Sequence, residues 1–220
     1  MIFAAGLLIR REPRVVHYAI LVACPIRSAA TATGKVVQLK GGNVVHPLVL
    51  QLRFARSEFM RAVSKLSEEE ASKRVMPMNS ISWTIGHLAW QEQRYFIYFP
   101  TGMHLIPEIE EKYAFGSAPS TPSAREMLKA WRRITKAADP WLNSLTSRDL
   151  LSMVEMGGRK TNRTYGNLLQ RVIYHYWYHI GENMAVRKIL GFVPVGYFVG
   201  NIDGKAPYVP DPWKGRGRGR

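Results

Sequence analysis

Apolar residues recur at helical spacing in four long stretches of this 220-residue chain. The stretches cover residues 47–66, 81–99, 122–145 and 164–191, and each has the apolar periodicity of one buried helix face. The expected buried faces contain Val49, Leu52, Phe59, Val63 and Leu66; Ile81, Ile85, Leu88, Tyr95 and Phe99; Met127, Trp131, Ile134, Ala138 and Leu145; and Leu168, Val172, Tyr176, Val186 and Leu190. Strand patterns are few, so the sequence predicts an all-α four-helix bundle.

Residues that start and stop helices separate these stretches. The expected caps are Ser67 with Glu70 as a capping box for one short extra turn, Asn79 or Ser80, Ser120 or Thr121 before Pro122, and Thr164. Gly191 is expected to end the last helix. Pro140 is expected to kink the third helix or divide it near Lys136, because proline lacks the N–H that an interior helix position needs.

The connections between the stretches differ in kind. Residues 103–121 contain prolines, a glycine and several hydroxyl residues, and we interpret them as a long crossover link that allows the second and third helices to be parallel or non-adjacent. Residues 146–163 contain Gly157-Gly158, which is turn chemistry compatible with a small hairpin. The Gly-, Pro- and aromatic-rich segment after Gly191 is predicted to pack on the body as an extended tail.

Two histidines lie one helical turn apart in the last predicted helix. His175 and His179 are four residues apart, so both imidazoles point toward the same, buried side. Buried polar rings need partners, which a shared metal ion or separate hydrogen bonds would supply; the spacing leaves both readings open. Glu182 follows on the same flank, three residues after His179. Position 176 is Tyr, so the segment does not have the zinc-protease signature.

Charge and composition narrow the class of protein. The formal charge is +15, of which the first 40 residues contribute +5 and the last seven +4, leaving +6 on the rest. We therefore divide the chain into a poorly ordered basic extension (1–42), a folded domain (43–213) and an Arg/Gly-rich tail (214–220), with a secretory signal as the alternative reading of the N-terminal segment. One cysteine, Cys24, excludes a disulfide framework within the chain, and no apolar run has the length of a membrane span. We expect a cytoplasmic protein.

Three segments together resemble the DinB-like superfamily, also called DinB/YfiT, of four-helix-bundle metalloproteins. They are LRFARSEFMRAV, MNSISWTIGHLAWQEQRYF and RVIYHYWYHIGENMAVRKILG, and the resemblance extends over residues 45–213. The family's motif is one histidine in the second helix and an H-x3-H pair in the last. It maps onto His87, His175 and His179. Spacing alone favours a solvated or structural role for His87, so its place in this set is implied by the resemblance. His104, in the link, is expected on the surface.

The resemblance implies a divalent metal held by these three histidines, with Zn or Ni best suited to nitrogen ligands. Three imidazoles leave a coordination position open, which favours catalysis over a structural site. Relatives of bacterial type move small thiols such as bacillithiol or mycothiol, so the resemblance implies a thiol transferase-like or hydrolase-like enzyme with a small-molecule substrate. A homodimer, as in relatives, is compatible with the sequence.

Helical geometry indicates which residues could hydrogen-bond to the ligating histidines or contact a substrate. Glu182 is the best placed partner for a ligand N–H, with a surface ion pair as its alternative role, and Glu92 is less well placed. Gln91 and Arg94 lie on the flank of His87.

Two other readings compete with the enzyme. In one, the metal only stabilises the bundle. In the other, the basic ends bind nucleic acid, although the tail has no interleaved aromatics and the middle of the chain has no recognised binding motif.

Overall fold

The computed structural model describes residues 45–156, 159–192, 196 and 199–208. The predicted extension (1–42) and Arg/Gly tail (214–220) lie outside these residues, and the domain boundaries stay predictions. The described chain is mainly helical with one small two-stranded sheet, which confirms the all-α prediction. None of the described helices is long and apolar enough to cross a membrane.

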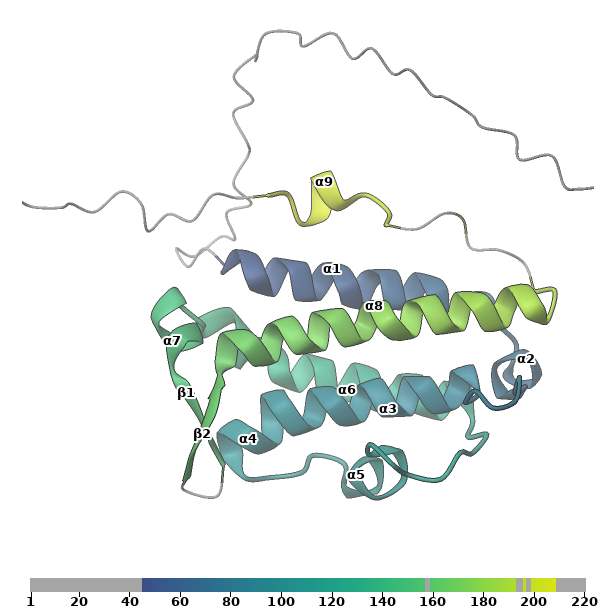
Figure 1. Cartoon of the computed structure of the whole chain (residues 1–220), viewed down its shortest axis with the longest axis horizontal. Helices are drawn as coiled ribbons and strands as arrows, with labels where there is room; N and C mark the ends of the chain where they lie inside the picture. Colours follow the sequence, from purple (N-terminus) through teal and green to yellow (C-terminus); the bar gives the residue numbers. More distant parts are fainter. Residues whose placement is uncertain (1–44, 157–158, 193–195, 197–198, 209–220) are drawn as a thin grey trace, which may run out of the picture. The chain divides into compact units, whose positions relative to one another are not determined.

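The elements follow one another along the chain as Figure 1 labels them. They are α1 (Pro47–Ala62), α2 (Glu68–Ser72), α3 (Ile81–Gln93), η1 (Arg94–Tyr98), α4 (Phe99–Thr101), α5 (Pro107–Tyr113), α6 (Ala124–Ser144), α7 (Ser147–Leu151), β1 (Met153–Met156), β2 (Arg159–Thr164), α8 (Tyr165–Ile189) and α9 (Ile202–Lys205). The four long helices α1, α3, α6 and α8 correspond to the four predicted stretches.

Most of the predicted caps are present. Ser80 and Thr164 accept the backbone N–H of Trp83 and Asn167, and Ser67 forms its capping box with Glu70. The prediction for the third helix was wrong at its start, because α6 begins at Ala124, with Ser123 as the cap.

The prediction that the third helix divides near Lys136 was also wrong. Helix α6 continues across Pro140 to Ser144. Pro140 removes only the hydrogen bond to the Lys136 carbonyl, and it lies close to the helix end. Buried Ala138 and Leu142 on either side hold the helix against the core.

Two other boundaries differ from the sequence pattern. The first helix ends at Ala62 instead of Leu66, and the chain turns at Lys65, which has a φ of 59°. The second stretch is helical to Thr101, but residues 94–98 form a wide π-helical turn that apolar periodicity does not reveal. Gly102, with a φ of 74°, ends it.

The four long helices form two parallel pairs that run antiparallel to each other (Figure 1). In the first pair, Phe54 of α1 packs on Trp177 of α8, and further along Arg187 donates to the Ala62 carbonyl. In the second, Phe96 of α3 packs on Trp141 of α6 with ring centroids 5.8 Å apart. Parallel α3 and α6 require the chain to return between them. Residues 102–123, which include α5, make that crossover, as predicted.

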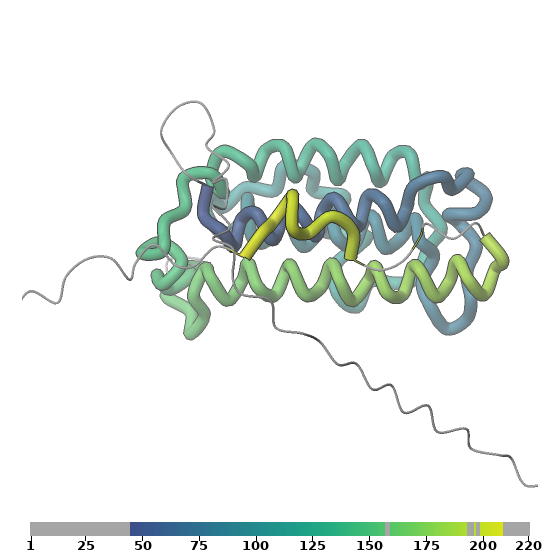
Figure 2. The backbone as a smooth tube through the Cα atoms, turned by 90° about the horizontal axis from the view of Figure 1, so that it is seen from above, coloured from purple at the N-terminus to yellow at the C-terminus, as the bar shows by residue number. Residues whose placement is uncertain are grey.

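Two smaller elements complete the described unit. β1 and β2 pair antiparallel, with Glu155 opposite Lys160, so the predicted hairpin is present. Residues 199–208 lie along the outer side of α1 (Figure 2), where the Gln51 side chain donates to the Ala206 carbonyl at 2.9 Å. The predicted packing of an extended tail on the body therefore holds for these described residues, with the short helix α9 inside it.

A buried polar network joins all four long helices at the centre of the core. Arg56 of α1 donates two hydrogen bonds, of 2.7 and 2.6 Å, to the Glu92 carboxylate of α3. The Tyr176 hydroxyl of α8 also donates to Glu92, at 2.8 Å, and accepts from the Trp131 indole of α6 at 2.7 Å. Asp139 of α6 accepts from Arg56 at 2.8 Å. This network fixes the helices' register near the histidines.

Candidate metal centre

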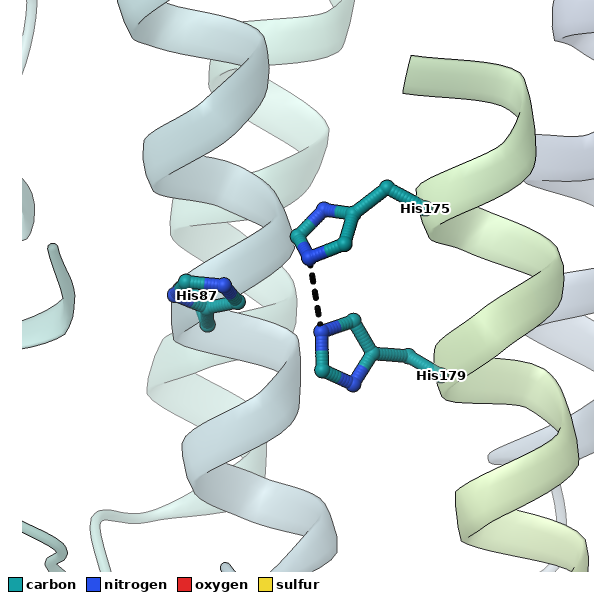
Figure 3. Close-up of side chains that lie close together, drawn as sticks. All are labelled: His87, His175 and His179. Atoms are coloured by element: carbon teal, nitrogen blue, oxygen red, sulfur yellow. Dashed lines mark hydrogen bonds between the residues drawn. The ribbon is translucent and has the colours of Figure 1, made fainter. Parts of the chain in front are cut away.

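Helix α8 contributes two of the three predicted ligands. His175 and His179 lie on successive turns, and their Nε2 atoms are 2.9 Å apart, within hydrogen-bond distance (Figure 3). His179 is buried and His175 is partly buried. The predicted common direction of the two imidazoles is therefore correct.

Helix α3 contributes the third histidine. The ring centroid of His87 lies 5.0 Å from that of His175 and 5.3 Å from that of His179 (Figure 3). One nitrogen from each of the three rings can be chosen so that all lie within 4.8 Å of one another. His87 is also stacked between Trp83 and Trp90, at centroid distances of 4.9 and 5.1 Å, so the ring has little freedom to turn.

Hydrogen bonds select which nitrogens are available. Nδ1 of His87 lies 2.7 Å from the backbone carbonyl oxygen of Tyr113, which only accepts, so Nδ1 carries the proton. Nδ1 of His179 lies 2.6 Å from the Glu182 carboxylate and is likewise the donor. With the proton on Nδ1, the neutral form of either ring has its lone pair on Nε2. The Glu182 contact predicted from helical geometry is present.

Burial keeps His87 and His175 uncharged. It lowers the pKa of His87 to about 4, more than the Tyr113 hydrogen bond raises it. It also lowers the pKa of His175 to about 3, and a proton on His175 would in addition be repelled by a proton on His179 or His87 and by the Arg171 cation. The hydrogen bond from His179 lowers the pKa of Glu182. At neutral pH His87 and His175 are therefore neutral, the form that binds metals, and Glu182 is ionised.

The donor set fits a divalent ion. Bonds from zinc to imidazole nitrogen are about 2.0–2.1 Å, so ligand nitrogens must lie within roughly 4 Å of one another, close to the observed spread. Neutral nitrogen donors suit Zn²⁺ or Ni²⁺. The hydrogen-bonded Nδ1 atoms of His87 and His179 match the outer contacts that ligating histidines usually make. Nδ1 of His175 has no hydrogen-bond partner among the described residues.

The other candidate residues have different surroundings. Glu92 belongs to the buried Arg56–Tyr176 network and does not contact His87, whose Nδ1 uses the Tyr113 carbonyl instead. Gln91 is 5% exposed, and its side-chain oxygen has no hydrogen-bond partner among the described residues, so it stays a candidate.

Arg94 and His104 contact residues outside the histidine cluster. The Arg94 guanidinium donates to Glu110 at 2.8 Å and lies over the Trp90 ring, so its charge is already paired. His104 is outside the cluster. It is partly exposed and stacks on Tyr98 at 4.2 Å, which corrects the prediction of a simple surface position.

Two supports of the centre were missed by sequence reasoning. The Tyr113 carbonyl is a backbone group, which no residue type marks. The stacking of Trp83 and Trp90 on His87 follows from i, i+4 and i, i+3 spacing, so that signal was present in the sequence.

Comparison with known proteins agrees with this architecture. The profile of the DinB superfamily matches residues 51–182, a segment that begins within α1 and includes His87, His175, His179 and Glu182. No curated protein matches the chain. The match extends over more than half of the sequence and contains the entire histidine cluster. The chain therefore belongs to the DinB superfamily.

Proposed function

We propose that this protein is a metal-dependent enzyme that activates a thiol or a water molecule, as a thiol S-transferase or a hydrolase. The observation that carries the proposal is the set of ligand nitrogens from His87, His175 and His179, all within 4.8 Å of one another. Structural zinc sites usually have four protein ligands, whereas three histidines leave a position for a reacting molecule.

The chain's own residues prepare the centre for this role. A divalent ion held by the three Nε2 atoms would lower the pKa of a bound thiol or water and so supply a nucleophile near neutral pH. The Tyr113 carbonyl and two tryptophan rings fix the orientation of His87. Glu182 holds the proton on Nδ1 of His179, which keeps Nε2 free to bind.

Metal analysis of the purified protein tests this proposal. We expect about one divalent ion per chain, with loading abolished in His175→Ala and His179→Ala and strongly weakened in His87→Ala. His104→Ala, which removes a histidine outside the cluster, is the control and should load normally. Full loading of the His175→Ala/His179→Ala double variant would rule out the proposed centre.

Chelation separates an enzyme from a bundle that uses metal only for stability. If the ion is structural, EDTA should cause a large fall in melting temperature, because binding energy would then be folding energy. The described bundle has a continuous apolar core and its own polar network, so we expect a folded, inactive apo-protein with helical circular dichroism intact. Unfolding by EDTA at room temperature would favour the structural alternative.

The remaining sequence-based expectations are part of this proposal. We expect a small-molecule substrate, and low-molecular-weight thiols are the first compounds to test. We also expect a cytoplasmic location and an oligomeric state compatible with a homodimer. Nucleic-acid binding is the less favoured alternative. Salt-dependent DNA or RNA binding that disappears when residues 1–42 and 214–220 are removed would support it.

A further inference from the structure

A shallow depression, open to solvent, lies along α8 beside one of the proposed ligands. Its volume is about 530 Å³, and it is lined by Asn167, Gln170, Arg171, Tyr174, His175 and Tyr178. We call it the α8 groove. Because His175 belongs both to the histidine cluster and to the lining, a molecule in the α8 groove lies next to the proposed metal position.

The lining has a definite chemical character. Arg171 is its one charged side chain, and no carboxylate is among the described residues that line it. Arg171 is exposed and makes no ion pair with a described residue. Asn167 and Gln170 add neutral amides that can donate hydrogen bonds. The nearest acidic group along α8 on that flank, Glu182, already accepts from His179.

Two tyrosines add flat apolar surface to the α8 groove. Tyr174 and Tyr178 are 66% and 61% exposed, which is unusual for large rings. Tyr178 also lies against the cluster, with its ring stacked on His175 and 4.9 Å from the His179 centroid. The wall of the α8 groove is thus continuous with the histidine cluster.

Helical spacing places the Arg171 cation near the proposed metal position. Arg171 comes four residues before His175, so both project from the same side of α8, roughly 6 Å apart along its axis. A ligand with a negative group two to four bonds from its reacting atom has the length to contact both positions.

We propose that the α8 groove selects substrates that carry an anionic group, a carboxylate, sulfonate or phosphate, which Arg171 binds while the reacting atom reaches the histidine centre. This inference rests on the proposed function and names its substrate class as a small anionic thiol. Asn167 and Gln170 orient the anion, and the exposed tyrosine rings pack on the carbon skeleton.

Two thiols of nearly equal length test the selection. Protein loaded with Co²⁺ is titrated with 2-mercaptoethanesulfonate and with 2-mercaptoethanol, following the cobalt–thiolate absorption. We expect the sulfonate to bind about 3- to 10-fold more tightly, the effect of one partly screened charge. Arg171→Gln should reduce the ratio to below about twofold. Lys188→Gln removes an exposed cation of the same helix outside the α8 groove and should keep the wild-type ratio.

A second titration decides the inference even if no thiol binds the metal. Ethanesulfonate, which has no thiol, is added to zinc-loaded protein while the arginine Nε–H signals are followed by NMR. A saturable shift of the Arg171 signal, absent with ethanol, supports the α8 groove as an anion site. No such shift, or an equal affinity for both thiols in the wild type, overturns it. Absence of cobalt–thiolate absorption with either thiol contradicts only the thiol part of the proposed function.

Discussion

The Glu182 carboxylate accepts a hydrogen bond of 2.6 Å from Nδ1 of His179, one turn earlier on α8. The contact is local to one helix, so it forms wherever this segment is helical. It fixes the tautomer of His179 and raises the basicity of the nitrogen that faces the other two histidines. If the proposed metal is bound, Glu182 would therefore act as a positioning residue for its ligand His179.

Glu182→Gln should weaken metal binding without unfolding the protein. A neutral amide is a poorer acceptor and does not fix the His179 tautomer, so we expect metal affinity to fall about 10- to 100-fold. Competition with a chromophoric chelator measures the affinity, and thermal melting of the apo-protein monitors the fold. Glu111→Gln, an exposed change on α5, is the matched control and should bind as the wild type does. Unchanged affinity in Glu182→Gln would leave the carboxylate without a role in the centre.

The residues of the centre differ in how far sequence alone predicts them. His175, His179 and Glu182 lie on one helix at spacings of four and three, so helical geometry is sufficient to place them together. His87 is on another helix, and its position depends on how α3 packs against α8. Local periodicity contains no information on that packing, and the family resemblance supplied it. The four-helix fold was predictable because each helix carries its own apolar face.

The interactions that were not predicted depend on three-dimensional register. Glu92 is close to His87 in sequence but bonds to Arg56 and Tyr176, because the parallel α1 and α8 bring those side chains to it. Tyr113 holds His87 through a carbonyl oxygen, and any residue type supplies the same group. Neither contact has a sequence pattern, so both required coordinates.

Gly86→Ala should disturb the centre through α5. A Cβ at position 86 would lie 2.8 Å from the Tyr113 ring and from the sulfur of Met127, so the Tyr113 ring and the Met127 side chain must shift. Because the Tyr113 carbonyl holds His87, we expect a loss of about 1–3 kcal/mol in unfolding free energy together with weaker metal binding.

The control for Gly86→Ala lies on α8. Gly181→Ala meets nothing within 4 Å and should stabilise its helix by about 0.5–1 kcal/mol. Urea unfolding and chelator competition measure both variants. The expectation fails if the two substitutions change stability in the same direction.

Acid should destabilise the metal-free protein between about pH 6.5 and pH 4. The pKa of His87 is lowered from 6.5 to about 4 by burial, so in this window the unfolded chain binds a proton that the folded chain does not. Stability is therefore present above pH 6.5 and is lost as the pH falls toward the folded pKa. From pH 7 to pH 5, the protonation of His87 alone should lower the free energy of unfolding by about 2 kcal/mol.

Urea unfolding in EDTA at pH 7, 6 and 5 measures this dependence. His87→Gln should flatten the decline relative to the wild type, and His104→Gln should keep the wild-type decline. An equally steep decline in His87→Gln would show that other groups cause the acid sensitivity.

Loss of Glu92 should cost more stability than any single exposed ion pair. Glu92→Leu leaves the Arg56 guanidinium buried without its main partner, and the Tyr176 hydroxyl without its acceptor, so we expect a loss of about 3–5 kcal/mol by urea unfolding. Asp139→Asn is the control within the same network, because that side chain is 41% exposed and its contribution should be at most about 1 kcal/mol. The double variant Arg56→Met/Glu92→Leu should recover much of the loss, since both charges are then gone. If it is as unstable as Glu92→Leu, the unpaired arginine is not the cause.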